Sequence, residues 1–426
     1  MTSATSRQRL FLASCIALIV TAMSFAIRAD IMGSLESEFK LDKEELGWIS
    51  GTAFWGFTVS MVVGGPLCDV LGMGRLLSLA FLGHLGGILL TVMAGGFNGL
   101  FFGTLLIGLA NGMVEAACNP LIATVYPEEK TKKLNQFHVW FPGGIVIGGL
   151  LAFALTQLDL NWQWKMATMI PLTLVYGLLF LGKAFPATER VASGVSFGEM
   201  FSACIRPLFI IMVLCMFLTA STELGTNQWL PNILNVTAGI SGILVLVWIN
   251  GLMAVGRQFA GPIVHRLSPS GMLFASALVS SAGVFALSKA TDGITAFGAA
   301  TIFAIGICYF WPTMLGFVSE RVPRSGALGL AIMGGAGMLS VSLVLPFMGR
   351  IYDENTSASL PEGADMAVLK EAAAGTPEAT QLAEAQAAGG VATLGTMIWL
   401  PVILIVVFGM IYLRDRKQGG YRAEQI

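Results

Sequence analysis

Long apolar stretches alternate with short polar ones along most of the chain. An α-helix needs about 20 apolar residues to cross the hydrocarbon core of a bilayer, and the apolar stretches here reach that length. An even number of spans would place both ends of the chain on one side of the membrane. The pattern predicts twelve membrane-spanning helices, at residues 9–34, 46–70, 76–96, 99–125, 134–157, 164–184, 205–231, 238–263, 270–288, 294–318, 326–350 and 394–413.

The composition is typical of an integral membrane protein. Hydrophobic residues make up 55% of the chain and charged residues 12%, whereas charged residues make up about 25% of a typical soluble domain. The net charge of −1 gives no reason to expect a nucleic-acid partner. The six cysteines lie in or beside apolar stretches, so we interpret them as packing residues. We expect no cofactor, and we expect a monomer whose partners are the lipid bilayer and a small-molecule substrate.

The basic residues predict the orientation in the membrane. With a cytoplasmic N-terminus, 17 of the 24 Lys and Arg residues, Arg257 among them, fall on the cytoplasmic side. Only Arg28 is assigned to the interior of a span. Because cytoplasmic segments carry an excess of Lys and Arg, we expect both termini in the cytoplasm and the protein in the inner membrane. The first apolar stretch is too long for a signal peptide, so we expect it to be the first span.

Two internal repeats divide the chain into halves. "GGPLCD" (64–69) matches "AGPIVH" (260–265), and "NPLIATVYPE" (119–128) matches "WPTMLGFVSE" (311–320) at nearly the same spacing. A repeat at constant spacing indicates two similar units. We therefore expect an all-α membrane protein of two pseudo-symmetric six-helix bundles, at 1–184 and 205–426. Residues 185–204 would form a cytoplasmic linker. Residues 353–392 would form an acidic, Ala-rich outer loop that acts as a solvated spacer and whose middle could be helical.

Several motifs resemble those of known transporters. "GGPLCDVLGMGR" resembles the signature after the second helix of the major facilitator superfamily, although Val70 stands where a cation is usual. The stretches "VEAACNPLIATVYPEEKTKKLNQFHVWFPGG", "WPTMLGFVSERVPRSGALGLAIMGGAG" and "ADIMGSLESEF" resemble the fucose–proton symporter family. The resemblance implies alternating access, substrate binding between the halves, a sugar substrate, and roles in proton coupling for Glu115 and Asp30.

Glu115 is the strongest single feature of the sequence. At about 1.5 Å per residue from the end of its helix, it lies near the middle of the hydrocarbon core. Charged residues at this depth are costly and are functional by default. Glu115 is therefore either a carboxylate that binds and releases a proton or a permanent partner of Arg28. Asp30 is either a second proton site or an interfacial, solvated side chain.

Arg28 departs from the fucose permease pattern and leaves the substrate open. It either neutralises Glu115 or binds an anionic group of the substrate through two parallel hydrogen bonds. An anionic sugar would reconcile this cation with a sugar site. The sequence predicts proton-coupled uptake of a monosaccharide or a related sugar. The alternatives are sodium coupling, in which Asp30 would hold the ion, and an exporter or antiporter of organic anions or drugs.

Other polar and aromatic residues within the spans are candidates for substrate binding. Amide and carboxylate groups bind sugar hydroxyls, while an aromatic ring covers the C–H side of a sugar. His138 is also a candidate proton carrier. Ordinary packing or hydrogen bonding between helices remains an alternative for each. No catalytic motif of an enzyme occurs, so we expect no enzymatic activity. The candidates are Asn111, Asn119, Gln136, His138, Trp140, Glu223, Asn227, Gln228, Trp229, Asn250, Tyr309 and Trp311.

Overall fold

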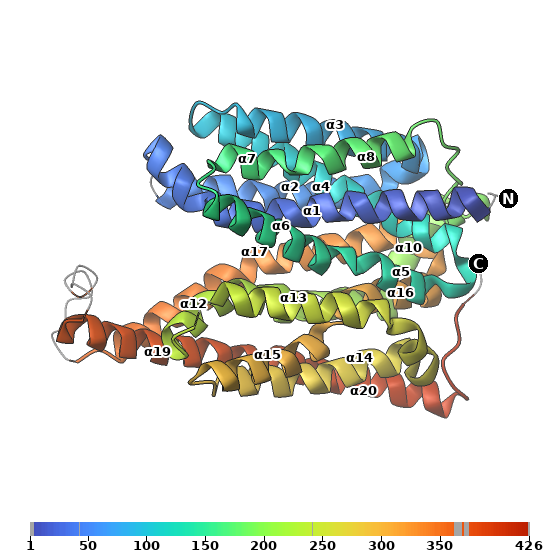
Figure 1. The fold of residues 1–426 in the computed structure, drawn as a ribbon. Helices are drawn as coiled ribbons and strands as arrows, with labels where there is room; N and C mark the ends of the chain where they lie inside the picture. Colours follow the sequence, from blue (N-terminus) through green and yellow to red (C-terminus); the bar gives the residue numbers. More distant parts are fainter. Residues whose placement is uncertain (1–3, 42, 241, 362–368, 370–374, 425–426) are drawn as a thin grey trace.

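The computed structural model describes residues 4–41, 43–240, 242–361, 369 and 375–424. All regular structure in these ranges is helical. The helices form two bundles side by side, and both chain ends lie at the same end of the molecule, here called the terminal end (Figure 1). Within the described ranges, ten helical units are long and apolar enough to cross a membrane, and a shorter apolar helix covers Leu244–Gln258. The expected all-α membrane architecture is confirmed.

Five of the six spans expected in the first bundle are among these units. The fifth is divided into α5 and α6, and the segment expected to form the sixth is divided into α7 and α8. α8 lies against α1 and α3. The elements are α1 (Ala4–Phe39), α2 (Lys43–Leu71), α3 (Met73–Val92), α4 (Phe97–Val125), the 3₁₀ turn η1 (Pro127–Glu129), α5 (Lys130–His138), α6 (Trp140–Gln157), α7 (Trp162–Ala167) and α8 (Met169–Phe180).

The second bundle repeats this plan with more irregularities. Its first span contains a π-helical turn, and Ser268 interrupts α14 with a φ of 63°. The elements are α11 (Pro207–Ala220), the π turn η2 (Ser221–Gly225), α12 (Thr226–Thr237), α13 (Gly242–Gln258), α14 (Ala260–Leu287), α15 (Gly293–Ile307), α16 (Phe310–Arg321), the 3₁₀ turn η3 (Pro323–Ser325), α17 (Gly326–Ala358), α19 (Pro377–Met397) and α20 (Trp399–Lys417).

The two repeated motifs have the same local geometry. α4 ends at a cap residue, Tyr126, with φ −127° and ψ 63°, and η1 then begins at Pro127. α16 ends at Val322 with φ −135° and ψ 53°, and η3 begins at Pro323. Proline suits the first position of a helix because its missing N–H would have no partner there. The predicted pseudo-symmetry therefore extends to matching turns.

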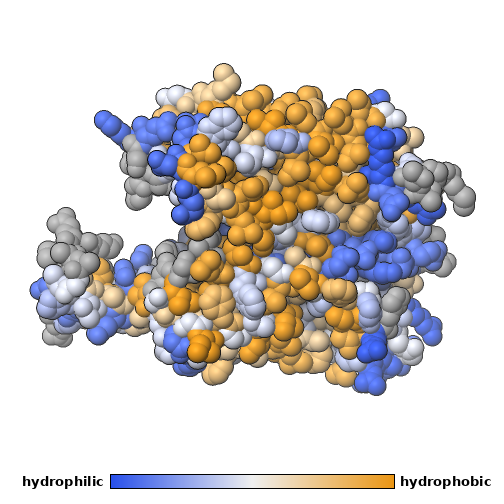
Figure 2. Space-filling model, in the orientation of Figure 1, coloured by the Kyte–Doolittle hydropathy of each residue, from blue (hydrophilic) through white to orange (hydrophobic). Residues whose placement is uncertain are grey.

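Small residues bring the halves together near the terminal end. A Cβ added at Gly65 of α2 would lie 2.5 Å from Cβ of Ala331 and 3.0 Å from the carbonyl oxygen of Ala327, both in α17. Gly316 of α16 lies equally close to Thr131 of α5. At the opposite end a notch separates the two halves (Figure 2). The molecule is thus closed between its halves at the terminal end and indented at the other.

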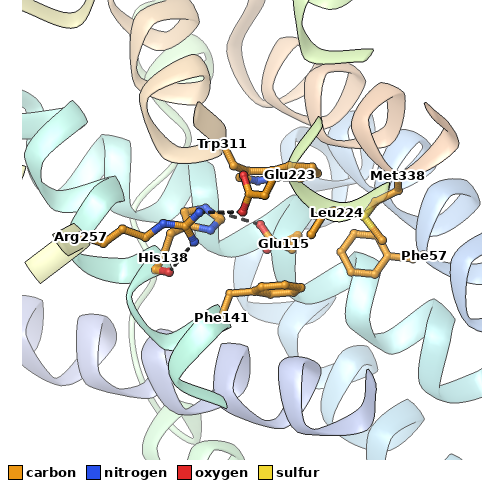
Figure 3. A pocket seen from close by; sticks show the side chains of 9 residues that line it. All are labelled: Phe57, Glu115, His138, Phe141, Glu223, Leu224, Arg257, Trp311 and Met338. Carbon is orange, nitrogen blue, oxygen red and sulfur yellow. Dashed lines mark hydrogen bonds and ion pairs between the residues drawn. The ribbon is translucent and has the colours of Figure 1, made fainter. Parts of the chain in front are cut away.

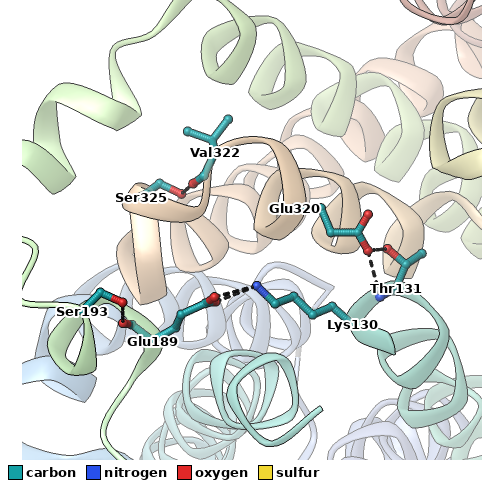
Figure 4. A network of polar contacts seen from close by, with 7 residues as sticks. All are labelled: Lys130, Thr131, Glu189, Ser193, Glu320, Val322 and Ser325. Carbon is teal, nitrogen blue, oxygen red and sulfur yellow. Dashed lines mark hydrogen bonds and ion pairs between the residues drawn. The ribbon is translucent and has the colours of Figure 1, made fainter. Parts of the chain in front are cut away.

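The linker forms two short helices at the terminal end, α9 (Glu189–Ala192) and α10 (Phe197–Cys204). Ser196 caps α10 and exchanges hydrogen bonds with Glu199 in a capping box. Lys130 of α5 forms an ion pair of 2.7 Å with Glu189 (Figure 4). The linker is therefore attached to the first bundle by a charged contact.

The outer segment differs from the expected loop. α17 continues to Ala358, and α19 begins at Pro377, so much of 353–392 is helical and projects beyond the bundles (Figure 1). The Ala-rich composition explains this, since alanine has the highest helix propensity. Gly389 lets α19 approach the backbone of α17 at Tyr352, with 2.6 Å from an added Cβ to its carbonyl oxygen. The middle of the segment, 362–368 and 370–374, lies outside the described residues.

Candidate functional site

A narrow cavity lies between the two halves (Figure 3). Its lining combines four ionisable side chains with five apolar ones and comes from both bundles. The first bundle supplies Phe57, Glu115, His138 and Phe141, and the second supplies Glu223, Leu224, Arg257, Trp311 and Met338.

In the first bundle, Glu115 is joined to His138 through an amide. Glu115 is 2% exposed, and its Oε2 accepts a hydrogen bond of 2.6 Å from Nδ2 of Asn119. With its Nδ2 committed to Glu115, Asn119 offers Oδ1 to Nε2 of His138 at 3.0 Å. That arrangement requires a proton on Nε2 of His138. The same nitrogen is 3.8 Å from Oε2 of Glu115. The described structure gives Glu115 no Arg or Lys partner.

In the second bundle, Glu223 and Arg257 form a buried ion pair. Nη2 of Arg257 donates to Oε1 of Glu223 at 2.8 Å, and the two side chains are 1% and 4% exposed. The other oxygen of Glu223, Oε2, has no hydrogen-bond partner in the described structure. Glu223 lies in the π turn η2, a feature that is frequent at functional sites. One carboxylate oxygen of Glu223 is thus hydrogen-bonded to Arg257, and the other can still accept a hydrogen bond.

Arg257 also links the halves and stabilises two helix breaks. Its Nη1 donates to the carbonyl oxygen of His138 at 3.0 Å, and its Nε donates to that of Cys308 at 2.6 Å. α5 ends at His138, and α15 ends just before Cys308, where helix carbonyls lack partners within the helix. One guanidinium therefore binds an acid and the carbonyl oxygens at two buried helix ends.

Arg257 is not among the site residues predicted from the sequence, where it counts among the cytoplasmic charges. The available signal was its place inside the predicted span 238–263, where an ionisable residue indicates a functional site by default. The number of cytoplasmic Lys and Arg residues that supports the orientation is therefore one lower. Glu223 was expected to bind a sugar hydroxyl, but the structure commits one of its oxygens to Arg257.

Arg28 does not pair with Glu115. Its guanidinium carbon lies 5.0 Å from the ring centre of Phe25 and 5.5 Å from that of Phe54, as in cation–π contacts. Of the two roles left open by the sequence, the described contacts therefore contradict neutralisation of Glu115. Binding of an anionic group remains a prediction.

Asp30 lies in an ion pair. Its Oδ2 accepts a hydrogen bond of 2.6 Å from Nζ of Lys165 in α7, which also donates to Thr156 of α6 at 2.8 Å. The Asp30 side chain is 35% exposed. The pair joins three helices of the first bundle. The geometry favours a structural role for Asp30 over a proton or sodium site.

Asn111 lies in a separate hydrogen-bond network within the first bundle. Its Oδ1 is 2.8 Å from Nε2 of His84, and its Nδ2 donates to Ser24 at 3.0 Å. Nδ1 of His84 is 2.8 Å from the hydroxyl of Tyr176. All of these side chains are buried. Asn111 therefore holds helices together and does not line the cavity, although it shares the spacing of Glu115 and Asn119.

Three candidates near the ends of their helices also lie away from the cavity. Gln136 accepts a hydrogen bond of 2.9 Å from Lys133, and Trp140 is 37% exposed on the surface. Gln228 is exposed. Their positions in interrupted helices turn these side chains outward or toward a neighbouring charge.

Three others use their polar groups to bind backbone. Trp229 donates to the carbonyl oxygen of Leu345 at 3.3 Å, Asn250 to that of Leu246 at 2.8 Å, and Tyr309 to that of Gly256 at 2.8 Å. Such bonds satisfy the polar groups of buried helices, so these residues are structural in this conformation.

Trp311 and Asn227 keep unused polar atoms. Trp311 lines the cavity, and its Nε1 has no partner in the described structure. The same holds for Oδ1 of Asn227, which is 5% exposed. Among the described residues, no group of three or more His, Cys, Asp or Glu side chains is placed to hold a metal ion.

Two similar helical bundles with a charged cavity at their interface are an architecture common among membrane transporters. The family model for the Major Facilitator Superfamily matches residues 10–349, and the chain belongs to this superfamily. The protein is therefore a secondary active transporter of a small-molecule substrate, crosses the membrane several times, and is not an enzyme.

The similar proteins carry varied substrates. The chain is 24% identical to the 3-(3-hydroxy-phenyl)propionate transporter of Escherichia coli (strain K12), covering 80% of this chain and 87% of that protein. It is 24% identical to D-xylose-proton symporter-like 2 of Arabidopsis thaliana, covering 74% of this chain and 61% of that protein. Both identities are low, and the two names differ in substrate class.

The structural neighbours support the fold alone. The E. coli fucose:proton symporter FucP matches with a TM-score of 0.67 and 15% identity, covering 92% of this chain and 98% of that one. The proton:xylose symporter XylE matches with a TM-score of 0.73 and 15% identity, covering 97% and 96%. The expected resemblance to sugar symporters thus extends to the architecture.

Proposed function

We propose that the protein is a proton-coupled symporter in which Glu115 carries the coupling proton. The substrate binds in the cavity between the halves. In this proposal the terminal end faces the cytoplasm, as the distribution of Lys and Arg predicts, and the notch in Figure 2 faces outward.

The contrast between the two buried acids carries the proposal. Glu223 is held by Arg257 at 2.8 Å, so removing its charge would leave a buried cation without a partner. Glu115 has an amide and an imidazole beside it instead. Its charge can therefore be removed by protonation without that penalty. A carboxylate fixed inside a membrane span is costly while it is charged, so it is suited to binding and releasing a proton.

Opening toward the cytoplasm must break identifiable contacts between the halves. Thr131 of α5 donates its hydroxyl and backbone N–H to Glu320 of α16, as Figure 4 shows. Deeper in the molecule, Arg257 donates to the carbonyl oxygen of His138. His138 thus contacts both the proton site and the opposite half, and we assign it the role of communicating between them.

The cavity suits a small solute with a ring and a polar group. Trp311, Phe57 and Phe141 offer apolar ring faces, while the free oxygen of Glu223 and the indole N–H of Trp311 offer one acceptor and one donor. A monosaccharide meets this description, and so does an aromatic acid such as the substrate named for the E. coli relative. Organic-anion export is the second candidate, because Arg28 has no acidic partner in the described structure. The Asp30–Lys165 pair disfavours sodium coupling at Asp30.

The test is proton movement with substrate in proteoliposomes that contain the purified full chain. L-fucose, D-xylose, D-glucuronate and 3-(3-hydroxyphenyl)propionate are added one at a time while the external pH is recorded. We expect alkalinisation with one of them and its loss in Glu115→Gln. Asp30→Asn should retain it, with Glu424→Gln as a surface control. Coupled proton uptake that persists in a folded Glu115→Gln would contradict the assignment.

A further inference from the structure

We infer that the substrate is a ring-bearing carboxylate with a single negative charge and that Arg28 binds this carboxylate. The substrate then crosses the membrane together with one proton, without net movement of charge. This inference rests on the proposed function and names the substrate class of the same site. Its starting point is Arg28, whose role no other observation explains.

Arg28 is a cation in a membrane span, and among the described residues it has no acidic partner. It belongs to the span Ser6–Met32 of α1 and is half-buried. Its neighbours Phe25 and Phe54 supply ring faces, and no described side chain accepts a hydrogen bond from its guanidinium. The planar guanidinium has five N–H donors in a geometry that matches a carboxylate. A ligand carboxylate would satisfy donors that the protein leaves unused.

Aromatic side chains connect Arg28 to the cavity. The ring centre of Phe25 lies 5.4 Å from that of Phe54, 6.3 Å from that of Phe57 and 6.1 Å from that of Phe141. Phe57 and Phe141 also line the cavity that contains Glu115 (Figure 3). A ligand with its carboxylate on Arg28 would therefore place its ring along this aromatic wall, on the side toward the proton site. The apolar lining favours an aromatic ring over a hydroxylated one.

The charges around the site balance in both the empty and the loaded carrier only if the ligand is a monoanion. Glu223 cancels Arg257, and Asp30 cancels Lys165. With a neutral His138, Glu115 and Arg28 are the charges that remain among the described residues around the site. In the empty carrier, an ionised Glu115 and Arg28 give no net charge.

In the loaded carrier, the proton neutralises Glu115, and a carboxylate on Arg28 restores the balance. A neutral sugar would instead leave one uncompensated positive charge in the membrane interior, which is costly. Both forms that must change conformation are neutral only if the substrate is a monoanion. The expected stoichiometry is therefore one proton for one carboxylate.

Two independent readouts test this inference. Binding is followed by the intrinsic fluorescence of the purified chain, with 3-(3-hydroxyphenyl)propionate and its uncharged amide as a matched pair, and with D-glucuronate and D-glucose as a second pair. We expect each acid to bind better than its neutral partner. Arg28→Gln should weaken binding of the acids by about tenfold or more, the loss expected for a charge-assisted bond. Lys289→Gln, which changes an exposed cation, should leave it unchanged.

Transport at clamped membrane potential tests the charge balance. Uptake of the acid, driven by an inward proton gradient, should be the same at zero and at inside-negative potential. Failure of every carboxylate to bind, or equal binding by Arg28→Gln, would overturn the inference. Proton-coupled uptake of a neutral sugar through Glu115 would also overturn it but leave the proposed function standing. Arg28-dependent binding of an acid without any proton movement would instead refute the proposed function.

Discussion

The buried pair of Glu223 and Arg257 makes a quantitative prediction about stability. In Arg257→Met, Glu223 keeps its burial but loses its cation, and breaking one side of a buried pair costs about 3–5 kcal/mol. Glu223→Leu should cost a similar amount for the opposite reason. In the double variant no buried charge is left unpaired. Its remaining cost, which Arg257→Met shares, is the loss of donors to the carbonyl oxygens of His138 and Cys308, about 1–3 kcal/mol for each.

The stability of the four proteins can be compared through the free cysteines. Five of the six are buried, so a thiol-reactive fluorescent dye reports unfolding in detergent. We expect the two single substitutions to be strongly non-additive, with the double variant more stable than Arg257→Met. If instead the two losses simply add, the pair is not coupled in the way that the geometry indicates. Retained size-exclusion profiles at low temperature serve as the folding control.

Three further predictions concern other parts of the molecule. Gly65→Leu inserts a side chain where α17 is already in contact with α2, so it should shift the protein toward the state that is open at the terminal end. Spin labels on η1 and η3 should then move apart. An unchanged distance between the labels would show that close packing at Gly65 does not hold the halves together. Asn111→Ala leaves a buried nitrogen of His84 without its partner and should cost about 1–3 kcal/mol in the same dye assay, but coupled proton uptake by the folded fraction should persist. Hydrogen bonds from the Ser196 backbone and hydroxyl lower the pKa of Glu199 below its ordinary value of 4.5. The cap therefore stabilises α10 fully above pH 4.5, and this stabilisation is lost as the pH falls through the lowered pKa. Amide exchange in α10 should accelerate over that range, and Glu199→Gln should remove the pH dependence.

The fold was predictable because its main signal is periodic and long. Each apolar stretch had to become a helix, since a span must satisfy its backbone hydrogen bonds internally. The repeated motifs at 119–128 and 311–320 then gave the two halves, and both end in matching 3₁₀ turns. The interruption of the fifth span at Val139 left no comparable signal. Helix was expected only in the middle of 353–392, which lies outside the described residues, whereas the structure shows helix at both flanks.

The site was predictable in part, for a different reason. Glu115, His138, Glu223 and Trp311 were recognised because polar or aromatic residues in spans are unusual, and all four line the cavity. The same criterion also selected residues such as Asn250 whose polar groups bind the backbone of a helix. Sequence shows which residues are polar but not which partner they find across the bundle.

The two functional groups of His138 have different partners, so genetics can separate them. Its imidazole contacts Asn119 of the proton site, whereas its carbonyl oxygen receives Arg257 from the opposite bundle. A side-chain substitution at position 138 removes the first contact and retains the second, because every amino acid supplies a carbonyl. The connection to the opposite bundle is thus independent of residue identity at this position, and it should persist in homologues that have exchanged the histidine.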